Sequence, residues 1–373
     1  MSKFCVPLKK PKPDSDRFIN ILMGKEGTDR PPVVDYLIDD DIMRLILEKL
    51  IGRKWVYPYK VEFGIKKIST SDKQAVLAYW DNYIEFWYRM GYDYVKLEMG
   101  YEFTLKTRIT KDTAQLSKGN RTWAEERKGL IENWKDFKSY PWPKLEDIDF
   151  FPFEYVSTHL PAGMKMIVSH AGGPLEWLTW ILSFQGLSIL LYENPELVKA
   201  ITDRIGNLMV RFYEHILEIP NICAIFPGDD MGFKTSTMIS PEHLLKYTLP
   251  WHKKFAEMAH AKGLPYFLHS CGNLEEIMEP LIEDAKIDGK HSFEDVIIGA
   301  ADFKHKYGAK IAVLGGVDMD YLSRYSVDEV RRYVRKLIED CAPGRRFAVG
   351  AGNSIANYVP IENYLTMLDE ALR

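Results

Sequence analysis

The amino-acid sequence predicts a (β/α)₈ barrel, an α/β fold in which eight parallel strands alternate with helices. Two observations favour this class. Short apolar, β-rich runs alternate eight times with longer helical patterns along the 373 residues. The first expected strand is not followed by a glycine-rich phosphate loop, so a doubly wound open sheet is the less favoured alternative. We expect an N-terminal arm over 1–29 and one barrel domain over 30–373, with an insertion at about 101–153.

The expected strands are short apolar runs, most of which end in Gly, His, Asp or Glu. The sixth run is the weakest, because Asp288 and Gly289 are poor strand formers. Polar residues follow most of the runs, which is where a barrel places its reactive groups. In chain order the runs are 32–36, 94–98, 164–169, 223–226, 265–269, 286–290, 310–314 and 346–349.

The expected helices show apolar residues at helical spacing and carry start and stop signals. The first ends before Gly91, a typical residue after a helix C-terminus, and others begin at Asn273 or Ser326, which are good N-caps. Their ranges are 72–90, 195–218, 241–261, 273–285, 296–307, 327–341 and 360–372.

The insertion at 101–153 interrupts the alternation of strands and helices. It contains Lys/Arg clusters, three Trp and a Pro-rich stretch. A segment of this length is expected to form a lid or side element over the barrel mouth. Its basic run over 106–128 is either a solvated face or an attractor of anionic ligands. The arm over 1–29 is expected to pack outside the barrel or against a second subunit of a homodimer.

Composition excludes several classes of partner. Apolar residues make up 46% and charged residues 27%, as in a soluble globular protein, and the formal charge is 49 − 53 = −4. That balance argues against nucleic acid or an anionic membrane as the main partner. There is no apolar run long enough to span a bilayer, and the polar start lacks the apolar core of a signal peptide. Four scattered cysteines do not form a disulfide framework, so we expect a cytoplasmic protein.

The sharpest motif is His269-x-Cys271 at the end of the fifth run. Imidazole and thiolate are preferred ligands of zinc, but a catalytic zinc needs at least three protein ligands. The candidates for the remaining ligands are Glu98, Asp229, Asp230, His291, Glu294 and Asp318. The alternative reading is a buried small cysteine beside a hydrogen-bonding histidine.

Other polar residues are expected at the same mouth. Asp229 and Asp230 follow Pro-Gly and are either acid/base groups or a helix N-cap. Glu98 lies at an apolar strand end, where it is a ligand, a substrate anchor or half of a salt bridge. His170 precedes Ala-Gly-Gly-Pro and is expected in the pocket, while Asp318 either orients a ligand or caps a turn.

From about residue 164 onward the chain resembles the uroporphyrinogen decarboxylase superfamily. The resemblance rests on SHAGGPLEWLTWILSFQG from Ser169, HSCGN from His269, LGGVD from Leu314 and GAGNSIANYVPIEN from Gly350, which occur in the order typical of the family. It implies a (β/α)₈ barrel. True decarboxylases of the family have an Arg motif after strand one, a Tyr where this chain has Trp180 and a His where it has Asn353.

The resemblance is nearer to the cobamide-dependent methyltransferase branch, which has an H-x-C zinc motif. It implies zinc on His269 and Cys271, with the later Cys of that branch replaced by Asn353 and an oxygen ligand such as Glu98 in its place. The implied activity is methyl transfer from a small methoxy-aromatic or methylamine donor to a corrinoid (cobalamin) on a partner protein.

We expect Asp229, Asp230, Glu98 and His291 in catalysis, and we expect His170, Trp177, Trp180, Asn353 and Asp318 to bind substrate. The alternatives are a decarboxylase of a tetrapyrrole or another carboxylic acid, and a non-catalytic corrinoid- or tetrapyrrole-binding protein.

Overall fold

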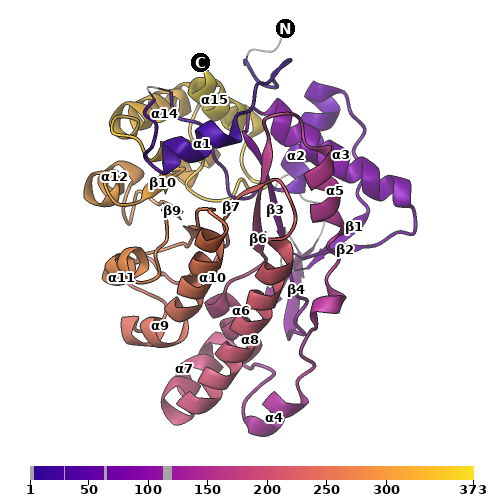
Figure 1. Cartoon of the computed structure of the whole chain (residues 1–373), viewed down its shortest axis with the longest axis vertical. Helices are drawn as coiled ribbons and strands as arrows, with labels where there is room; N and C mark the ends of the chain where they lie inside the picture. Colours follow the sequence, from indigo (N-terminus) through magenta and orange to yellow (C-terminus); the bar gives the residue numbers. More distant parts are fainter. Residues whose placement is uncertain (1–3, 29, 63–64, 112–119) are drawn as a thin grey trace.

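The structure, a computed structural model, describes residues 4–28, 30–62, 65–111 and 120–373 as a mixed α/β fold (Figure 1). Parts of the expected arm (1–3 and 29) and of the insertion (112–119) lie outside the described residues. The strands are β1 (Tyr59–Glu62), β2 (Ile65–Ile68), β3 (Tyr94–Met99), β4 (Thr107–Lys111), β5 (Asn120–Ala124), β6 (Lys165–His170), β7 (Ile222–Ile225), β8 (Phe267–His269), β9 (Gly289–His291), β10 (Ala312–Leu314) and β11 (Phe347–Ala348).

The helices cover the expected helical runs and several others. They are α1 (Ser15–Leu22), α2 (Asp40–Ile46), α3 (Lys73–Arg89), α4 (Trp134–Ser139), α5 (Phe151–His159), α6 (Pro174–Leu182), α7 (Phe184–Glu193), α8 (Pro195–Ile216), α9 (Pro241–Tyr247), α10 (Leu249–Ala261), α11 (Met278–Glu283), α12 (Ala300–Tyr307), α13 (Met319–Arg324), α14 (Val327–Cys341) and α15 (Ile361–Leu372). Short irregular turns are η1 (Leu47–Ile51), η2 (Leu145–Asp147) and η3 (Glu275–Ile277).

Seven strands form one parallel series. β3, β6 and β7 pair in that order, and β8, β9, β10 and β11 pair in sequence order. Parallel bridges from Ile225 to Tyr266 and from Gly228 to His269 join β7 to β8. Seven of the eight expected runs thus become parallel strands, and the predicted parallel α/β class is confirmed.

The first expected strand joins the other end of this series. Val33 bridges to Val349 in parallel, beside β11. Within the described residues, backbone pairing between 33–36 and β3 is not found, so the closed barrel stays a prediction. Side chains join the two segments instead. The Tyr94 hydroxyl donates to the Asp35 carbonyl at 2.8 Å and accepts from the Asp35 N–H at 3.0 Å, and the Tyr36 hydroxyl donates to Glu98 at 2.5 Å.

Two expected helices differ in extent. The run over 241–261 breaks between α9 and α10, where Pro250 cannot supply the backbone N–H that a continuous helix needs. The run over 296–307 becomes helical only at Ala300, because 294–298 form a turn in which the Ile298 N–H donates to the Glu294 carbonyl. The helices lie around the parallel strands in Figure 1.

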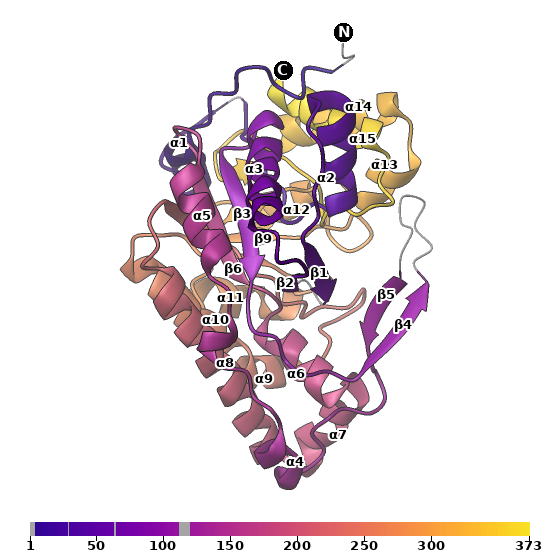
Figure 2. The same ribbon diagram turned by 90° about the vertical axis from the view of Figure 1, so that its right-hand side faces the viewer.

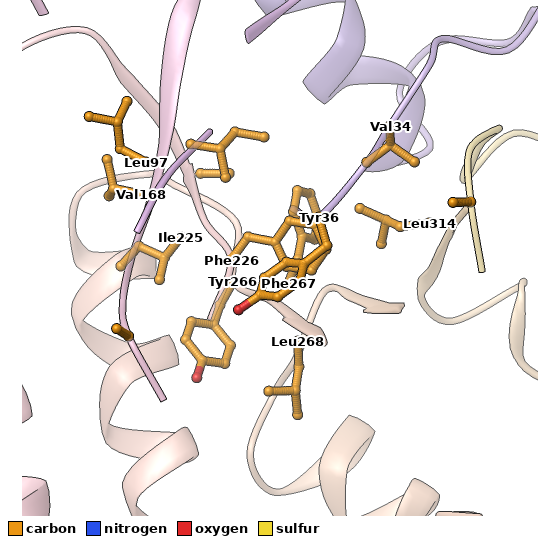
Figure 3. Close-up of a cluster of buried hydrophobic side chains, with 14 of the residues drawn as sticks. Val34, Tyr36, Leu97, Val168, Ile225, Phe226, Tyr266, Phe267, Leu268 and Leu314 are labelled. Carbon is orange, nitrogen blue, oxygen red and sulfur yellow. The ribbon is translucent and has the colours of Figure 1, made fainter. Parts of the chain in front are cut away.

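Aromatic rings fill the space between the strands (Figure 3). The Phe226 ring centroid lies 5.0 Å from that of Tyr36 and 6.0 Å from that of Phe267. Val34, Leu97, Val168, Ile225 and Leu314 belong to the same buried cluster. This apolar packing supports the polar residues that follow the strands.

The insertion is partly a separate feature. β4 and β5 form an antiparallel hairpin that stands apart from the helices in Figure 2. The segment after it packs on the body, since the Leu130 N–H donates to the Ile181 carbonyl at 2.8 Å and the Gln185 N–H donates to the Glu126 carbonyl at 3.2 Å. Whether this segment acts as a lid stays a prediction.

The arm packs on the parallel strands through α1. The ring of Phe18 lies 5.2 Å from that of Tyr94, and the Arg346 N–H donates to the Ile21 carbonyl at 3.0 Å. A second subunit is therefore not required to cover this part of the arm.

No single helix in the described ranges is long and apolar enough to cross a membrane. One pair, α6 and α7, meets the length and composition criteria only when joined across its 95° bend.

Candidate metal centre and active site

Three different ligand atoms converge after β7 and β8. The Nε2 atom of His269 lies 3.4 Å from Cys271 Sγ and 3.6 Å from Asp230 Oδ1, and one ligand atom from each residue lies within 4.8 Å of the others. Tetrahedral zinc with bonds of roughly 2.0–2.3 Å separates its ligand atoms by about 3.3–3.8 Å. The nitrogen, sulfur and oxygen donors therefore suit zinc in chemistry, and the two distances from His269 Nε2 fall within this range.

A second histidine fixes the proton on His269. The Nε2 atom of His291 lies 3.0 Å from the Ala351 carbonyl, which can only accept, so this nitrogen carries the proton. Burial lowers the pKa of His291 well below its usual value, which leaves Nδ1 as an acceptor. His269 Nδ1, 2.6 Å away, must then donate to it. The Nε2 lone pair of His269 is left facing Cys271 and Asp230, as a metal ligand requires.

His269 is suited to stay neutral. Burial, together with the positive charges of Lys290 and Lys96, lowers its pKa to about 3. Its ring stacks on that of Tyr36, with centroids 4.2 Å apart and planes at 10°. The imidazole is therefore held in one orientation by the Tyr36 ring stacked on its face and by the hydrogen bond from its Nδ1 to His291.

The Cys271 sulfur accepts two further hydrogen bonds. Asn353 Nδ2 donates to it at 3.3 Å and Ser292 Oγ at 3.6 Å, and the Cys271 N–H donates to Asp230 Oδ1 at 2.9 Å. Burial raises the pKa of the thiol, and the Asp230 carboxylate adds to this effect. Asn353 therefore lies beside the sulfur, at the position where the family resemblance implies a second cysteine.

A polar cluster centred on Glu98 lies next to this group. Oε2 of Glu98 accepts from Tyr36 Oη at 2.5 Å, from Ser169 Oγ at 3.0 Å and from Lys96 Nζ at 3.4 Å. Lys96 also donates to Ser169 Oγ at 2.7 Å and lies 4.8 Å from the Tyr36 ring centroid. Burial lowers the pKa of Lys96 to about 8. The oxygen position beside His269 and Cys271 is taken by Asp230 rather than by Glu98.

The Asp229 carboxylate accepts hydrogen bonds from the first turn of α6 and contacts His252. The N–H groups of Leu175 and Glu176 donate to Oδ1 at 3.0 Å, and His252 Nε2 lies 2.9 Å from Oδ2. A Cβ atom on Gly173 would lie only 2.1 Å from Asp229 Cγ, so glycine is needed for this approach. The N-cap alternative therefore describes Asp229, although the helix it caps is α6 and not the one that follows it in sequence.

Glu176 is a further acid of the site. Its Oε2 accepts from the Gly173 N–H at 2.9 Å, which closes the first turn of α6. Burial and the neighbouring carboxylates Asp230 and Asp229 raise its pKa well above the usual value. Glu176 thus retains its proton more readily than an exposed glutamate does.

Two residues expected to bind substrate, His170 and Asp318, instead make contacts that support the fold. The His170 ring lies 5.3 Å from Tyr213 and 5.5 Å from Phe255, between the sheet and helices α8 and α10. Because side chains alternate along a strand, its neighbour Ser169 faces the site and His170 faces the helices. Asp318 accepts from the backbone N–H groups of Asp320 at 2.7 Å and Asp295 at 2.8 Å, so it caps α13.

The tryptophans form an aromatic wall. Trp177 is buried, donates from Nε1 to the Ala171 carbonyl at 2.7 Å, and lies 4.4 Å from the Phe103 ring. Trp180 is only partly buried and meets Trp177 edge-on at 4.8 Å. Contact with a substrate stays a prediction for both residues.

Sequence reasoning missed four residues of the site, namely Tyr36, Lys96, Ser169 and Glu176. A signal existed for Lys96 and Ser169. A lysine two positions before Glu98 shares its strand face, and Ser169 shares a face with the other inward residues of β6. Glu176 also had a local signal, because a glutamate three residues after Gly173 is typical of a capped helix start. Tyr36 carried no comparable signal, since its contact with Glu98 joins distant parts of the chain.

The described residues thus form a parallel α/β fold with a cluster of polar, potentially metal-ligating side chains beyond the strand ends. The sequence model of the uroporphyrinogen decarboxylase (URO-D) family matches residues 153–373, and the chain belongs to this family. A methyltransferase from Methanosarcina mazei has a similar fold, with a TM-score of 0.68 at 13% identity over 96% of this chain and 98% of that one.

A second solved structure is less similar. It is a protein from Listeria monocytogenes described as a vitamin-B12-independent methionine synthase, with a TM-score of 0.47 at 11% identity over 92% of this chain and 96% of that one. No curated protein sequence matches this chain significantly.

Proposed function

We propose that this protein is a methyltransferase that moves a methyl group from a small methylated donor to a corrinoid on a partner protein. The observation that carries the proposal is the donor set of Asp230, His269 and Cys271 within 4.8 Å. Membership of the URO-D family and the fold shared with a methyltransferase support it. The proposal includes closure of the parallel series into a (β/α)₈ barrel whose mouth holds this site.

Asp230, His269 and Cys271 would hold zinc. When bound, zinc acts as a Lewis acid that draws charge from the heteroatom carrying the methyl group. The mixed oxygen, nitrogen and sulfur donor set is harder than a two-thiolate set and suits an oxygen or nitrogen heteroatom. His291 is a positioning residue, because it acts through His269 by fixing which nitrogen is unprotonated.

An ether oxygen that loses its methyl group gains a proton, and Lys96 could supply that proton through Ser169 and Glu98. Tyr36 and Lys96 both hold hydrogen atoms that point at Glu98 Oε2, and Ser169 links Lys96 to the same oxygen. A proton can move along this short chain without a large displacement of any side chain. Asp229 contributes by holding α6, and with it Glu176, at its position.

Two donor classes fit different features of the site. The wall of Trp177, Trp180 and Phe103 suits an aryl methyl ether. The carboxylates of Glu98 and Asp230 suit a methylated ammonium, whose positive charge they would attract. Both classes belong in the test.

The test combines metal analysis with turnover. Purified protein is expected to hold about one zinc per chain, and His269→Ala to hold much less. The change from the cob(I)alamin to the methylcobalamin spectrum is then followed with methoxy-aromatic and methylamine donors. Transfer that requires both the donor and His269 is the expected result. Absence of transfer from every donor, together with absence of binding to a corrinoid protein, would contradict the proposal.

Decarboxylation of a tetrapyrrole is the rival enzymatic function, and the charges at the site do not favour it. A polycarboxylate would meet the carboxylates of Glu98 and Asp230, while Lys96 is already paired with Glu98. Release of carbon dioxide dependent on Glu98 would establish this rival. Tight corrinoid or tetrapyrrole binding without turnover would instead identify a binding protein.

A further inference from the structure

A second buried lysine lies outside the metal centre, on the other face of β9. Lys290 precedes His291, so the alternation of side chains turns it away from His269 and toward helix α12. Only 3% of the residue is exposed. Its ammonium lies 4.6 Å from the Phe293 ring centroid and 5.6 Å from that of Phe303. Lys290 therefore places a cation in a mainly apolar region.

Within the described ranges, this ammonium has no carboxylate at ion-pair distance. Nζ donates to the Ser292 carbonyl, which satisfies one of its three N–H groups. Among the residues that the structure describes, no carboxylate is recorded within 4.0 Å of it, and Glu294, Asp230 and Cys271 act on it only from farther away. Burial lowers its pKa to about 8, so most of the molecules carry the charge at neutral pH. A buried cation without a partner is costly, and a bound anion would remove that cost.

A cavity of about 300 Å³ is lined by this lysine. The apolar side chains of Leu274, Met278, Ile298 and Phe303 form much of its wall. The other cation of the lining, Lys306, is already paired with Glu275, so the cavity offers one uncompensated positive charge. The volume is at the small end of the range for small-molecule sites, roughly 300–1,000 Å³.

We propose that this cavity binds a small organic monoanion, a carboxylate with an apolar body. The carboxylate would accept hydrogen bonds from the Lys290 ammonium, and the body would lie on Leu274, Met278 and Phe303. An inorganic anion would leave that apolar wall unused, and a dianion would exceed the single free charge. The proposal does not depend on methyl transfer, and binding alone tests it.

The probe is hexanoate, titrated calorimetrically into the full-length protein at pH 7 and compared with hexanamide, its neutral counterpart. We expect one hexanoate site per chain and at least tenfold weaker binding of hexanamide. Lys290→Met, which keeps the side-chain volume and removes the charge, should weaken hexanoate binding at least tenfold. Lys96→Met is the matched control for loss of a buried lysine, since Lys96 is also buried but belongs to the polar cluster around Glu98, and this variant should bind hexanoate as the wild type does.

His269→Ala excludes binding of the carboxylate to a metal ion, and this variant should also retain hexanoate. If Lys290→Met does not fold, as judged by circular dichroism, Ile298→Trp fills the cavity while leaving the charge in place and should abolish binding. Equal affinity for hexanoate and hexanamide would overturn the proposal. Unchanged binding in both cavity variants, or absence of any binding because the cavity holds only water, would overturn it as well.

Discussion

The proton on a single nitrogen decides whether His269 can bind a metal ion. His291 accepts the hydrogen of His269 Nδ1 at 2.6 Å and passes its own to the Ala351 carbonyl at 3.0 Å. The direction of both hydrogen bonds follows from the carbonyl, which has no hydrogen to give. A backbone oxygen two residues before Asn353 thus controls the lone pair beside Cys271.

Replacing His291 by Phe tests this control. The variant keeps a planar aromatic ring at this position, but the acceptor for His269 Nδ1–H is lost, and His269 becomes free to carry its proton on Nε2. Loss of such an outer partner lowers metal affinity by about 10–100-fold. Competition with a chromogenic zinc chelator measures the change. An affinity equal to that of the wild type would show that His291 does not position His269.

The Asn353→Cys variant tests the position of the replaced family cysteine. Asn353 Nδ2 lies 3.3 Å from Cys271 Sγ, so a thiolate at residue 353 would lie close enough to join the same zinc ion. Zinc affinity is expected to rise at least tenfold, because a second thiolate is a strong zinc ligand. Asn353→Ala, which offers no ligand, is the control and should not raise the affinity.

Single residues show where sequence reasoning succeeds and fails. His269 and Cys271 were found because their spacing is local, and Asn353 was placed beside them by family resemblance. His170 was assigned to the pocket because it follows an apolar run, but strand alternation gives the inward position to Ser169. Tyr36 reaches Glu98 across 62 positions of sequence, and such a contact leaves no local pattern.

At the scale of elements, two adjacent aspartates have different roles. One supports a helix, and the other lies in the candidate metal centre. Asp229 holds the N-terminus of α6 and the buried His252, whereas Asp230 is partly exposed beside Cys271. One Gly-Asp-Asp turn therefore supplies both the support of a helix and a candidate metal ligand.

Asp229→Ala should lower the free energy of unfolding by about 2–4 kcal/mol, because two backbone N–H groups and His252 lose a buried acceptor. Urea unfolding followed by circular dichroism measures this value. Asp230→Ala is the neighbouring control, expected to change stability by less than about 1 kcal/mol while losing zinc. If the two variants were equally unstable, Asp229 would not have the special structural role assigned to it.

The elements themselves were largely predictable. Strand runs and capped helices carry their signals within a few residues, as Asp72 before α3 and Ser326 before α14 show. The break between α9 and α10 was missed because apolar spacing continues across Pro250, and only the missing N–H of proline interrupts the helix. The helix in the arm was missed because its stretch is surrounded by Pro and Lys.

At the scale of the whole molecule, a buried carboxyl joins the first and last parts of the sheet. Asp35 Oδ1 accepts from the Ala351 N–H at 2.9 Å, and Oδ2 accepts from the Tyr92 hydroxyl. Tyr92 in turn contacts the Tyr364 hydroxyl of α15 at 2.8 Å. Burial raises the pKa of Asp35 from 3.8 to about 7.

The raised pKa predicts a pH dependence of stability. Between about pH 4 and pH 7 the folded state keeps the Asp35 proton that the unfolded chain releases, so this residue's contribution to stability is lost as the pH rises through that window. The loss is on the order of 4 kcal/mol. Asp35→Asn keeps one carbonyl acceptor for the Ala351 N–H, resembles the protonated acid and does not titrate, so its stability should increase relative to wild type by that order from pH 4 to pH 7. A constant difference across the window, measured by denaturant unfolding at each pH, would contradict this.

The join between residues 33–36 and β3 has a mechanical consequence. Elsewhere backbone amides join neighbouring parallel strands, but at this edge two tyrosine hydroxyls make the connection. One of them, Tyr36, donates to the same Glu98 oxygen that would pass a proton on during turnover. A ligand that accepted the hydrogen of the Tyr36 hydroxyl would break the Tyr36–Glu98 contact, and so weaken this edge, when it binds at the site. Local opening between 33–36 and β3 would therefore become more frequent when a ligand binds. Faster hydrogen exchange of the backbone amides of β3 in the presence of ligand would reveal it.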